Sequence, residues 1–522
     1  MKKLLVLLSG ILILTACEDF LLETPQDQLD VNQFFSDPSH AYNAVSILYR
    51  NGVPGFYGAG GAYSGSTMMI GGYMSGLFDN EYKGQEVHVQ HAHNLTLTPI
   101  NMANYLDNIW NNTYLAVSRA NSAIKYIPDT PGLSDSEKVN LIAQARFFRA
   151  LNYFHLVKTF GDVPLITEPY ESLENLYVER TPVQSVYQQI VTDLEYIINE
   201  SALNYVPMPA NNYRVSKAAA ATLLADVYLT MSGYPVQNDN YANAATAARR
   251  VINSGNLNLI PNGATEAESA YNVLRTSDNE SEYIYVVEYS AGIAENGWLP
   301  AYSYPNRLAA FGLFRYDITV NVYRPLDEIL QIYDPNDDLR IQEKQFFHSS
   351  VTRAGTTYEY EVSPYLWHDD VALFETRRGD KDQYIYRYAE VLLIAAEAIA
   401  RSEGVTAEAI DYLVQVRSRG YWQTDENVLR AQLTGLSVEE FVREVWTERL
   451  REFPLEFKLW NDVQRTRLFP VTSEANPGQV NFVNVVGHTN AWGHALQERH
   501  LLLPISENEI QRNPNLVQNP GY

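Results

Sequence analysis

Residues 141–160 read LIAQARFFRALNYFHLVKTF and are followed by GDVP at 161–164. Apolar side chains recur in this stretch at three- and four-residue spacing, which is the period of an amphipathic helix. Phe148 widens the apolar stripe, so we expect the helix to pack against neighbours on more than one side. The glycine and proline that follow predict where the helix ends. The residues of the stripe are Phe147, Leu151, Phe154 and Val157.

The same spacing recurs in both directions along the chain, so the predicted fold class is mainly α. Residues 217–229, KAAAATLLADVYL, present small alanines that let a partner helix approach closely. Paired helices with Ala and Tyr at their contacts resemble tetratricopeptide hairpins, although a strict repeat period is absent. Helices are expected at 104–127, 135–160, 182–200, 213–232, 241–254, 383–402, 406–419 and 436–452.

Two stretches lack helical spacing and are predicted to be irregular. Residues 51–100 are rich in Gly, Tyr and Asn, and residues 255–382 mix short β-like runs, such as Glu282–Tyr289, with Pro, Asn and aromatic residues. Long loops on a rigid scaffold are where binding residues tend to lie. The expected ranges are 41–522 for a single body, about 41–260 and 383–465 for its helical scaffold, and about 51–100 and 261–382 for a loop-rich ligand face with a few short β-strands.

The chain has 522 residues and an acidic composition. Lys and Arg total 38 against 62 Asp and Glu, which gives a formal charge of −24. Such a surface repels phosphate backbones, so nucleic acid is not an expected partner. Tyr is abundant, with 37 residues, and combines an apolar ring face with a hydroxyl that prefers water. This composition suits contact with sugars or peptides, and it equally suits helix packing near a surface.

The N-terminus has the pattern of an export signal. Lys2 and Lys3 precede an apolar run, Leu4–Leu14, that is too short to span a bilayer comfortably. LTAC at 14–17 resembles a bacterial lipobox, in which the peptidase cuts before the cysteine and the cysteine is lipidated. Cys17 is the only cysteine of the chain, and we expect it to be the lipidation site. The expected ranges are 1–16 for the lipoprotein signal peptide and 17–40 for the lipidated tether.

Several motifs together resemble the SusD/RagB family of Bacteroidetes outer-membrane lipoproteins, nearly from end to end. The most specific is ARFFRALNYFHLVKTFGDVPLI at 145–166, an arginine-flanked aromatic helix followed by Gly-Asp-Val-Pro-Leu. Any one motif is moderate evidence, whereas all of them in the family's order are strong evidence. The others are CEDFLLETPQDQ at 17–28, RVSKAAAATLLADVYL at 214–229, RYAEVLLIAAEA at 387–398 and NPNLVQNPGY at 513–522.

The chain departs from the family pattern at two places. The motif at 448–465, ERLREFPLEFKLWNDVQR, has Phe457 and Leu459 where members commonly have Gly and Arg. The segment Leu503-Pro504-Ile505 lacks the tryptophan that often precedes its proline. Both motifs are interpreted as structural, so these departures concern local packing rather than function.

The resemblance implies a mostly helical, SusD-like fold whose tetratricopeptide-like pairs support an irregular ligand face. It further implies a lipid-anchored outer-membrane protein, facing the cell exterior, that captures oligosaccharide and acts as a lid on a TonB-dependent transporter of the SusC/RagA type. A minority of the family handles peptides, so a lid for peptide uptake is the alternative. The family has no shared catalytic residues, which implies that the chain is not an enzyme.

The sequence lacks the common catalytic motifs. The chain contains neither a Gly-x-Ser-x-Gly elbow nor a phosphate-binding Gly-Lys loop, and GAGGAYSG at 58–65 has Tyr63 where a dinucleotide fingerprint needs its third glycine. A glycosidase needs two carboxylates at a defined separation, and candidate pairs are too plentiful to be informative. Asp79 and Glu81 are the acidic residues most expected to face a ligand, as hydrogen-bonding groups. An anchored glycosidase remains the least favoured hypothesis.

Metal and cofactor sites are not expected. His88, His91 and His93 could in principle hold zinc, but on an extended segment only the last two share a face. The run from Asp334 to Asp338 copies the first ligand positions of a calcium loop. It then has Leu339 where that loop requires glycine, so we interpret it as a turn preceding Arg340.

Sugar recognition uses aromatic faces against the C–H faces of the rings, with amides, carboxylates or guanidinium groups beside them. Two loops offer this combination, at 297–317 and 73–84. Trp110, in contrast, lies in a helical pattern and is expected in the core. The candidate ligand-binding residues are Trp298, Tyr302, Tyr304, Asn306, Arg307 and Phe314 in the first loop and Tyr73, Asp79, Asn80 and Tyr82 in the second.

Overall fold

The computed structural model describes residues 34–53, 66–84, 86–172, 174–290, 292–294, 299–315 and 319–522. The predicted signal peptide, Cys17, most of the predicted tether and Trp298 lie outside these ranges. None of the helices within them is both long enough and apolar enough to cross a membrane.

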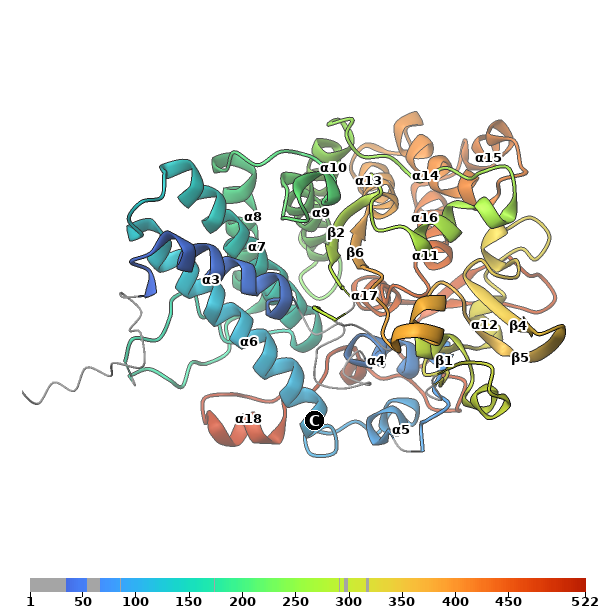
Figure 1. Cartoon of the computed structure of the whole chain (residues 1–522), viewed down its shortest axis with the longest axis horizontal. Coiled ribbons are helices and arrows are strands. Elements are labelled where there is room, and N and C mark those ends of the chain that lie inside the picture. Colours follow the sequence, from blue (N-terminus) through green and yellow to red (C-terminus); the bar gives the residue numbers. More distant parts are fainter. Residues whose placement is uncertain are drawn as a thin grey trace, which may run out of the picture.

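A curved row of antiparallel helices forms the scaffold (Figure 1). Consecutive members pack as pairs from α6 to α10, and the row continues from α10 to α13, α14 and α16. This arrangement confirms the predicted mainly α fold with helical hairpins. The scaffold helices are α3 (Pro38–Asn51), α6 (Ala103–Tyr126), α7 (Asp135–Phe160), α8 (Val183–Glu200), α9 (Lys217–Ser232), α10 (Tyr241–Ile252), α13 (Tyr388–Glu403), α14 (Ala407–Gly420) and α16 (Val438–Glu452).

The central helix α7 begins and ends as its sequence predicts. Ser134 and Glu137 form a capping box at its start, and Gly161 ends it with a φ of 74°. This corner favours glycine for its conformation, since a Cβ there would meet only the flexible end of Leu502, at 2.9 Å from Cδ1. Phe147 and Phe148 are both fully buried, which confirms that α7 packs on more than one side.

Two helix predictions were too long. Residues 383–387 form strand β6 (Gln383–Arg387), which pairs antiparallel with β2 (Tyr283–Val287) ahead of α13. The predicted helix at 213–232 begins only at Lys217, because the side chain of Ser216 accepts a hydrogen bond from the Ala219 amide and caps it. The β-like run predicted at 282–289 is confirmed by β2.

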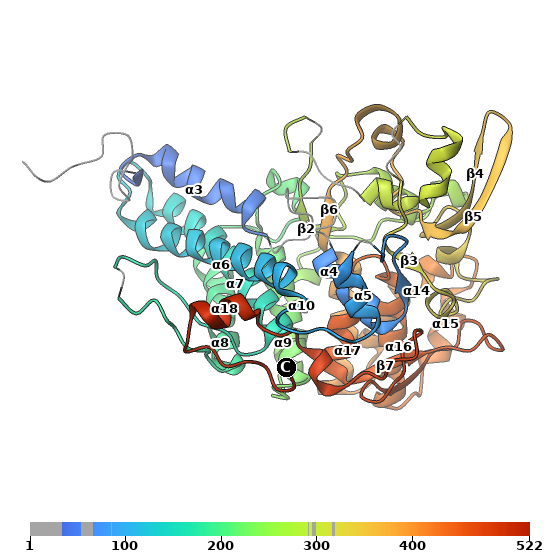
Figure 2. The ribbon, with the colours of Figure 1, turned by 90° about the horizontal axis from the view of Figure 1, so that it is seen from below.

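The remaining elements are short, and most of them, apart from α18, lie toward the end of the molecule that holds the β4–β5 hairpin (Figure 2). The described strands form four antiparallel pairs: β1 (Phe78–Asp79) with β3 (Arg324–Pro325), β2 with β6, β4 (Phe347–Arg353) with β5 (Thr356–Pro364), and β7 (Leu468–Val471) with β8 (Asn481–Asn484). The short helices are α4 (Ser66–Ser75), α5 (Val87–His93), α11 (Ala270–Thr276), α12 (Asp327–Leu330), α15 (Glu426–Leu433), α17 (Leu459–Thr466) and α18 (Glu507–Arg512).

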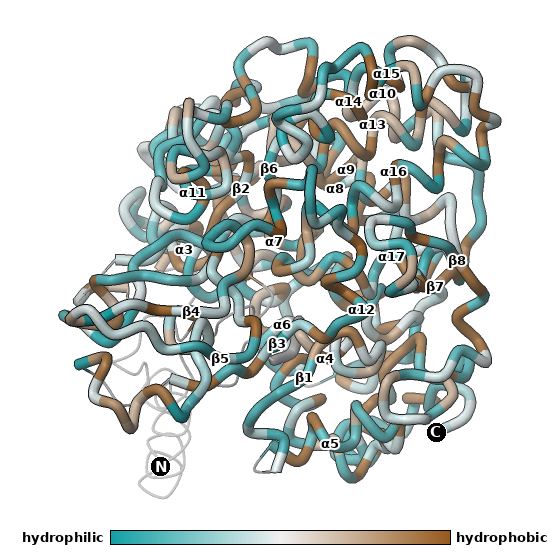
Figure 3. The backbone as a smooth tube through the Cα atoms, turned by 90° about the vertical axis from the view of Figure 1, so that its right-hand side faces the viewer, coloured by the Kyte–Doolittle hydropathy of each residue, from teal (hydrophilic) through white to brown (hydrophobic). Residues whose placement is uncertain are grey.

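The described part of the chain has two hydrophobic clusters. The larger one runs through the helical row, and in Figure 3 hydrophobic and hydrophilic segments alternate along the chain, as expected for packed amphipathic elements. The smaller one, which we call the loop cluster, lies beneath the irregular region. Its buried members are Tyr304, Leu308, Leu313, Phe314, Tyr360 and Leu373.

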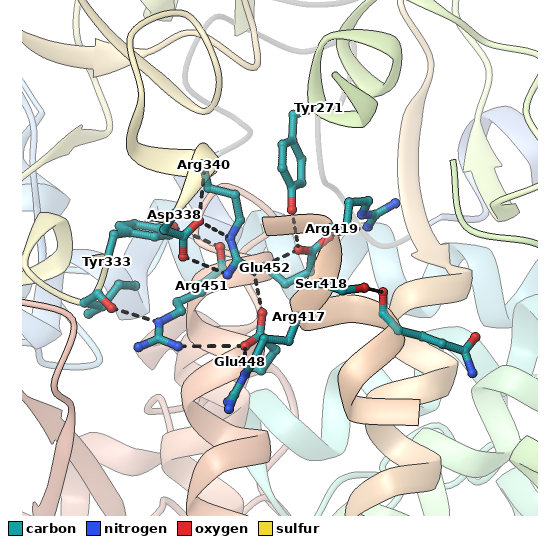
Figure 4. A network of polar contacts seen from close by, with 12 residues as sticks. Tyr271, Tyr333, Asp338, Arg340, Arg417, Ser418, Arg419, Glu448, Arg451 and Glu452 are labelled. Carbon is teal, nitrogen blue, oxygen red and sulfur yellow. Dashed lines mark hydrogen bonds and ion pairs between the residues drawn. The ribbon is translucent and has the colours of Figure 1, made fainter. Parts of the chain in front are cut away.

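A buried network of charges joins α14 and α16 to the segment before β4 (Figure 4). Arg340 donates to Glu448 at 2.7 Å and to Glu452 at 3.1 Å, and all three side chains are fully buried. Arg417 and Arg419, from α14, donate to Glu448 and Glu452 respectively. Buried charges are tolerated only when they are paired in this way, so the network fixes how the three segments meet.

The departure from the family pattern at Phe457 has a structural counterpart. Phe457 has a φ of 60°, a left-handed conformation that glycine adopts without strain. Its ring is 5% exposed and packs edge-on to Tyr323, with ring centroids 5.3 Å apart. Packing of the ring therefore offsets a backbone conformation that is unfavourable for a side chain.

Candidate functional site

The two loops chosen from the sequence contact each other directly. The Glu81 carboxylate accepts hydrogen bonds from the backbone amides of Asn306, at 2.9 Å, and Asn321, at 3.0 Å. Strand β1 pairs with β3 beside this contact, and Arg324 on β3 donates to Asp79 at 2.7 Å. We call the surface formed by residues 73–84, 299–315 and 347–378 the loop face. The two candidate loops thus form one surface, and ligand binding there stays a prediction.

Asp79 is held in ion pairs rather than presented to solvent. It is 6% exposed and accepts hydrogen bonds from Lys83 and Arg324. Burial opposes its ionisation, but the hydrogen bonds from Arg324 and Lys83 outweigh burial and hold its pKa below the ordinary value. A carboxylate with this pKa is charged at neutral pH, so Asp79 is not suited to be the proton donor of a glycosidase.

Four of the predicted stacking residues are buried instead. Tyr73, Tyr302, Tyr304 and Phe314 are each 5% exposed or less, so they offer no free ring face to a ligand. The Tyr304 hydroxyl lies 2.8 Å from His368 Nδ1, and the Tyr73 hydroxyl donates to the Val322 carbonyl at 2.5 Å. This burial contradicts their predicted role as stacking surfaces. Their rings build the support beneath the loop face, where a tyrosine can satisfy its hydroxyl within the protein.

Of the remaining predicted residues, one is buried and the others are at least partly accessible. Asn80 is 1% exposed and uses its side chain to bond the Tyr73 hydroxyl and the Tyr82 amide, so it is structural. Arg307 is exposed and pairs with Glu361 at 2.9 Å. Asn306 and Tyr82 are half-buried. Ligand contact by Arg307, Asn306 and Tyr82 stays a prediction.

The structure adds an aromatic pair that the sequence did not predict, made of one exposed and one half-buried ring. Phe311 is 56% exposed, and its ring centroid lies 5.2 Å from that of Tyr358 on β5. The Arg307–Glu361 ion pair lies on the same two segments. Ala354-Gly355, both at positive φ, form the hairpin turn that brings β5 back along β4. That turn was the available signal, because recognising the hairpin would have placed Tyr358 on a surface strand.

A second aromatic pair lies beside Tyr304, whose ring centroid is 5.7 Å from that of His368. Tyr365 and His368 stack with ring centroids 5.0 Å apart and planes 10° apart, and both are half-buried. The Arg275 guanidinium lies 4.7 Å from the centroid of Tyr365. The His368 side chain is 10% exposed and the Tyr365 ring already contacts both His368 and Arg275, so this pair supports the loop face rather than presenting a free ring.

The histidines of HVQHAH lie on helix α5, and the extended segment assumed for them is wrong. His93 stacks on Trp492 with centroids 3.6 Å apart, and burial lowers its pKa to about 4. His88 stacks on Tyr105. Among the described residues no cluster of three His, Cys, Asp or Glu could hold a metal ion. Asp338 binds Arg340 at 2.8 Å, which confirms the predicted turn before that arginine.

Two family models match separate parts of the chain. The model described as "SusD family" matches residues 349–522, and the model described as "Starch-binding associating with outer membrane" matches residues 63–229. The chain belongs to the SusD/RagB family. The recognition based on the motifs is therefore confirmed.

Similar members of the SusD/RagB family align with most of this chain. SusD-like protein P2 of Formosa agariphila is 27% identical over 539 residues, with 98% of each chain covered. The starch-binding protein SusD of Bacteroides thetaiotaomicron is 24% identical over 76% of this chain and 75% of that one. A crystal structure of a SusD superfamily protein from Parabacteroides distasonis has a TM-score of 0.81 at 28% identity, with 93% of this chain and 99% of that chain covered.

Proposed function

We propose that the protein is a cell-surface lipoprotein that binds oligosaccharide at the loop face and delivers it to a TonB-dependent transporter. The observation that carries the proposal is the exposed ring of Phe311, which packs on the half-buried Tyr358 beside the Arg307–Glu361 ion pair. Exposed aromatic rings beside charged hydrogen-bonding groups match the alternating apolar and polar surfaces of a sugar. The relative named a starch-binding protein supports a glycan as the class of ligand.

The protein is proposed to bind its ligand without chemical conversion. Asp79, the carboxylate favoured from the sequence, is committed to Lys83 and Arg324. Cys17 is proposed to carry the lipid that holds the protein at the outer membrane, facing the exterior. Several acyl chains on one residue suffice for stable anchoring, whereas a single chain does not.

Affinity electrophoresis of the purified protein tests this function. We expect retarded migration in gels that contain starch or laminarin. Phe311→Ala should weaken the retardation, since it removes an exposed ring and leaves the loop cluster intact, and Trp298→Ala should do the same. Tyr42→Ala is the matched control, because Tyr42 is 43% exposed on the distant helix α3.

Three results would contradict the proposal. Retardation only by a peptide mixture would favour the peptide-uptake role, and release of reducing ends would favour a glycosidase. Equal retention of wild type and Phe311→Ala in every glycan gel would remove this part of the loop face from the site.

A further inference from the structure

A pocket of about 250 Å³ lies between α6, α18 and the irregular segment that follows α7, residues 164–172 and 174–178. We call it the strap pocket, after that segment. Figures 1 and 2 both place α18 beside α6, at the opposite end of the molecule from the β4–β5 hairpin. The strap pocket is therefore separate from the loop face. Trp110 is 7% exposed, which confirms its predicted position in the core, and it also lines the pocket.

Hydrogen bonds hold the strap in place and preform the pocket. The Tyr114 hydroxyl donates to the Pro164 carbonyl at 2.8 Å, and Asn121 donates to the Ile166 carbonyl at 2.9 Å. At the other end Asn513 donates to the Val178 carbonyl at 2.8 Å, and Asn515 donates to the Tyr177 carbonyl at 2.6 Å. A ligand entering a pocket built in this way does not have to order its walls.

Aromatic and aliphatic side chains gather at the pocket without being buried. Tyr170 is 49% exposed, Tyr177 is 57% exposed and Leu176 is 41% exposed, and all three line the pocket with Trp110 and Tyr114. Single exposed apolar residues are normal on a protein surface, whereas several around one hollow mark a binding site.

Charged groups complete the lining. Glu168 lies on the strap, and Glu509 and Arg512 form an ion pair on α18. Carboxylates and a guanidinium beside aromatic rings supply acceptors and donors for neighbouring hydroxyl groups. The volume lies below the roughly 300 Å³ at the lower end of pockets that enclose drug-sized ligands, so it suits one or two sugar rings.

We propose that the strap pocket is a second carbohydrate-binding site, for a terminal or short hexose unit, in which aromatic rings stack on the sugar and Glu168, Glu509 and Arg512 bond its hydroxyls. The choice of a sugar as the ligand rests on the proposed function of the chain. Two separated sites on one protein would let a long glycan bind by avidity, since the second contact becomes intramolecular.

Ligand-detected saturation-transfer NMR on the full-length protein, with maltose and laminaribiose as separate probes, tests the strap pocket. Ser118→Trp fills the pocket from the exposed face of α6, and Tyr177→Ala removes one wall. Thr192→Trp, at an exposed position of α8, is the matched control for the added ring. Melting curves of all variants should coincide with wild type, which verifies that each one folds.

We expect the disaccharide signal to survive Phe311→Ala and Thr192→Trp and to fall about fivefold or more in Ser118→Trp and Tyr177→Ala. If Ser118→Trp leaves the disaccharide signal unchanged, the proposed site in the strap pocket is wrong. This result would not affect the proposed site at the loop face, which is tested by retention on starch. A wild type without any disaccharide signal would also overturn it. The proposed function is judged separately, by the effect of Phe311→Ala on polysaccharide retention.

Discussion

Arg387 donates to Glu452 at 2.7 Å although the two residues are 65 positions apart and neither side chain is exposed. The same guanidinium also bonds Glu282 and Glu456. We expect Arg387→Met to lower the free energy of unfolding by roughly 3–5 kcal/mol, because it leaves buried carboxylates without their partner. Urea unfolding followed by circular dichroism measures this loss.

Arg249→Met is the control for this experiment. Arg249 pairs with Glu403 and Glu408 at the surface, where an ion pair contributes below about 1 kcal/mol. Equal losses in the two variants would mean that burial does not set the energetics of the Arg387 network.

Asp382 makes stability depend on pH. Burial, with the nearby charge of Asp278, raises the pKa of Asp382 to about 7. Between about pH 4 and pH 7 the folded state therefore holds a proton that the unfolded chain releases, so this group reduces stability as the pH rises. We expect Asp382→Asn to raise the melting temperature relative to wild type at pH 8 and to have little effect at pH 4.

The asparagine keeps the acceptor that Asp382 offers to the Tyr289 amide, at 2.8 Å. Asp370 is a suitable comparison, because its exposed carboxylate has a pKa lowered by a hydrogen bond from His368. Asp370→Asn should not raise the melting temperature at pH 8. Two results would contradict the assignment to Asp382: an equal rise in melting temperature for Asp370→Asn at pH 8, or a rise for Asp382→Asn that persists at pH 4.

Glu81 is expected to hold the two loops of the loop face together. Glu81→Ala removes the carboxylate that accepts from the amides of Asn306 and Asn321. Hydrogen exchange read by mass spectrometry should show faster exchange in peptides containing these two amides and unchanged exchange in α7. Glu179→Ala removes an exposed carboxylate just after the strap and should leave both peptides as in wild type.

Cys17→Ser tests the lipid anchor. If Cys17 carries the lipid, the variant should move from the membrane fraction to the soluble fraction, because the thiol that is acylated is absent. The melting temperature of the body should stay the same. Recovery of the variant in membranes at the wild-type level would exclude Cys17 as the anchor.

The scaffold was predictable from the sequence because its helices are long and periodic. In α7 the apolar stripe, the capping serine and the terminating Gly161 all indicate the same element. The errors lie at helix ends, where a helical pattern directly follows a strand. Residues 383–387 pair with β2, which lies about 100 positions earlier in the chain, and such a distant contact leaves no local signal in the sequence.

The site was less predictable, since composition does not distinguish an aromatic ring under a loop from one on it. Tyr304 and Phe311 lie seven positions apart in one loop, yet Tyr304 is 2% exposed and Phe311 is 56% exposed. The difference arises from β4 and β5, distant segments that bury the first ring and contact the second through Tyr358 while leaving it largely exposed.

The loop cluster packs apart from the main core, with Tyr304, Phe314 and Tyr360 among its own members. Substitutions above it can change the shape of the loop face with little effect on the helical row, because distant sites contribute independently to stability. Ligand preference in this architecture is thus free to diverge between descendants of one gene, while the charged network of α14 and α16 constrains the frame that they share.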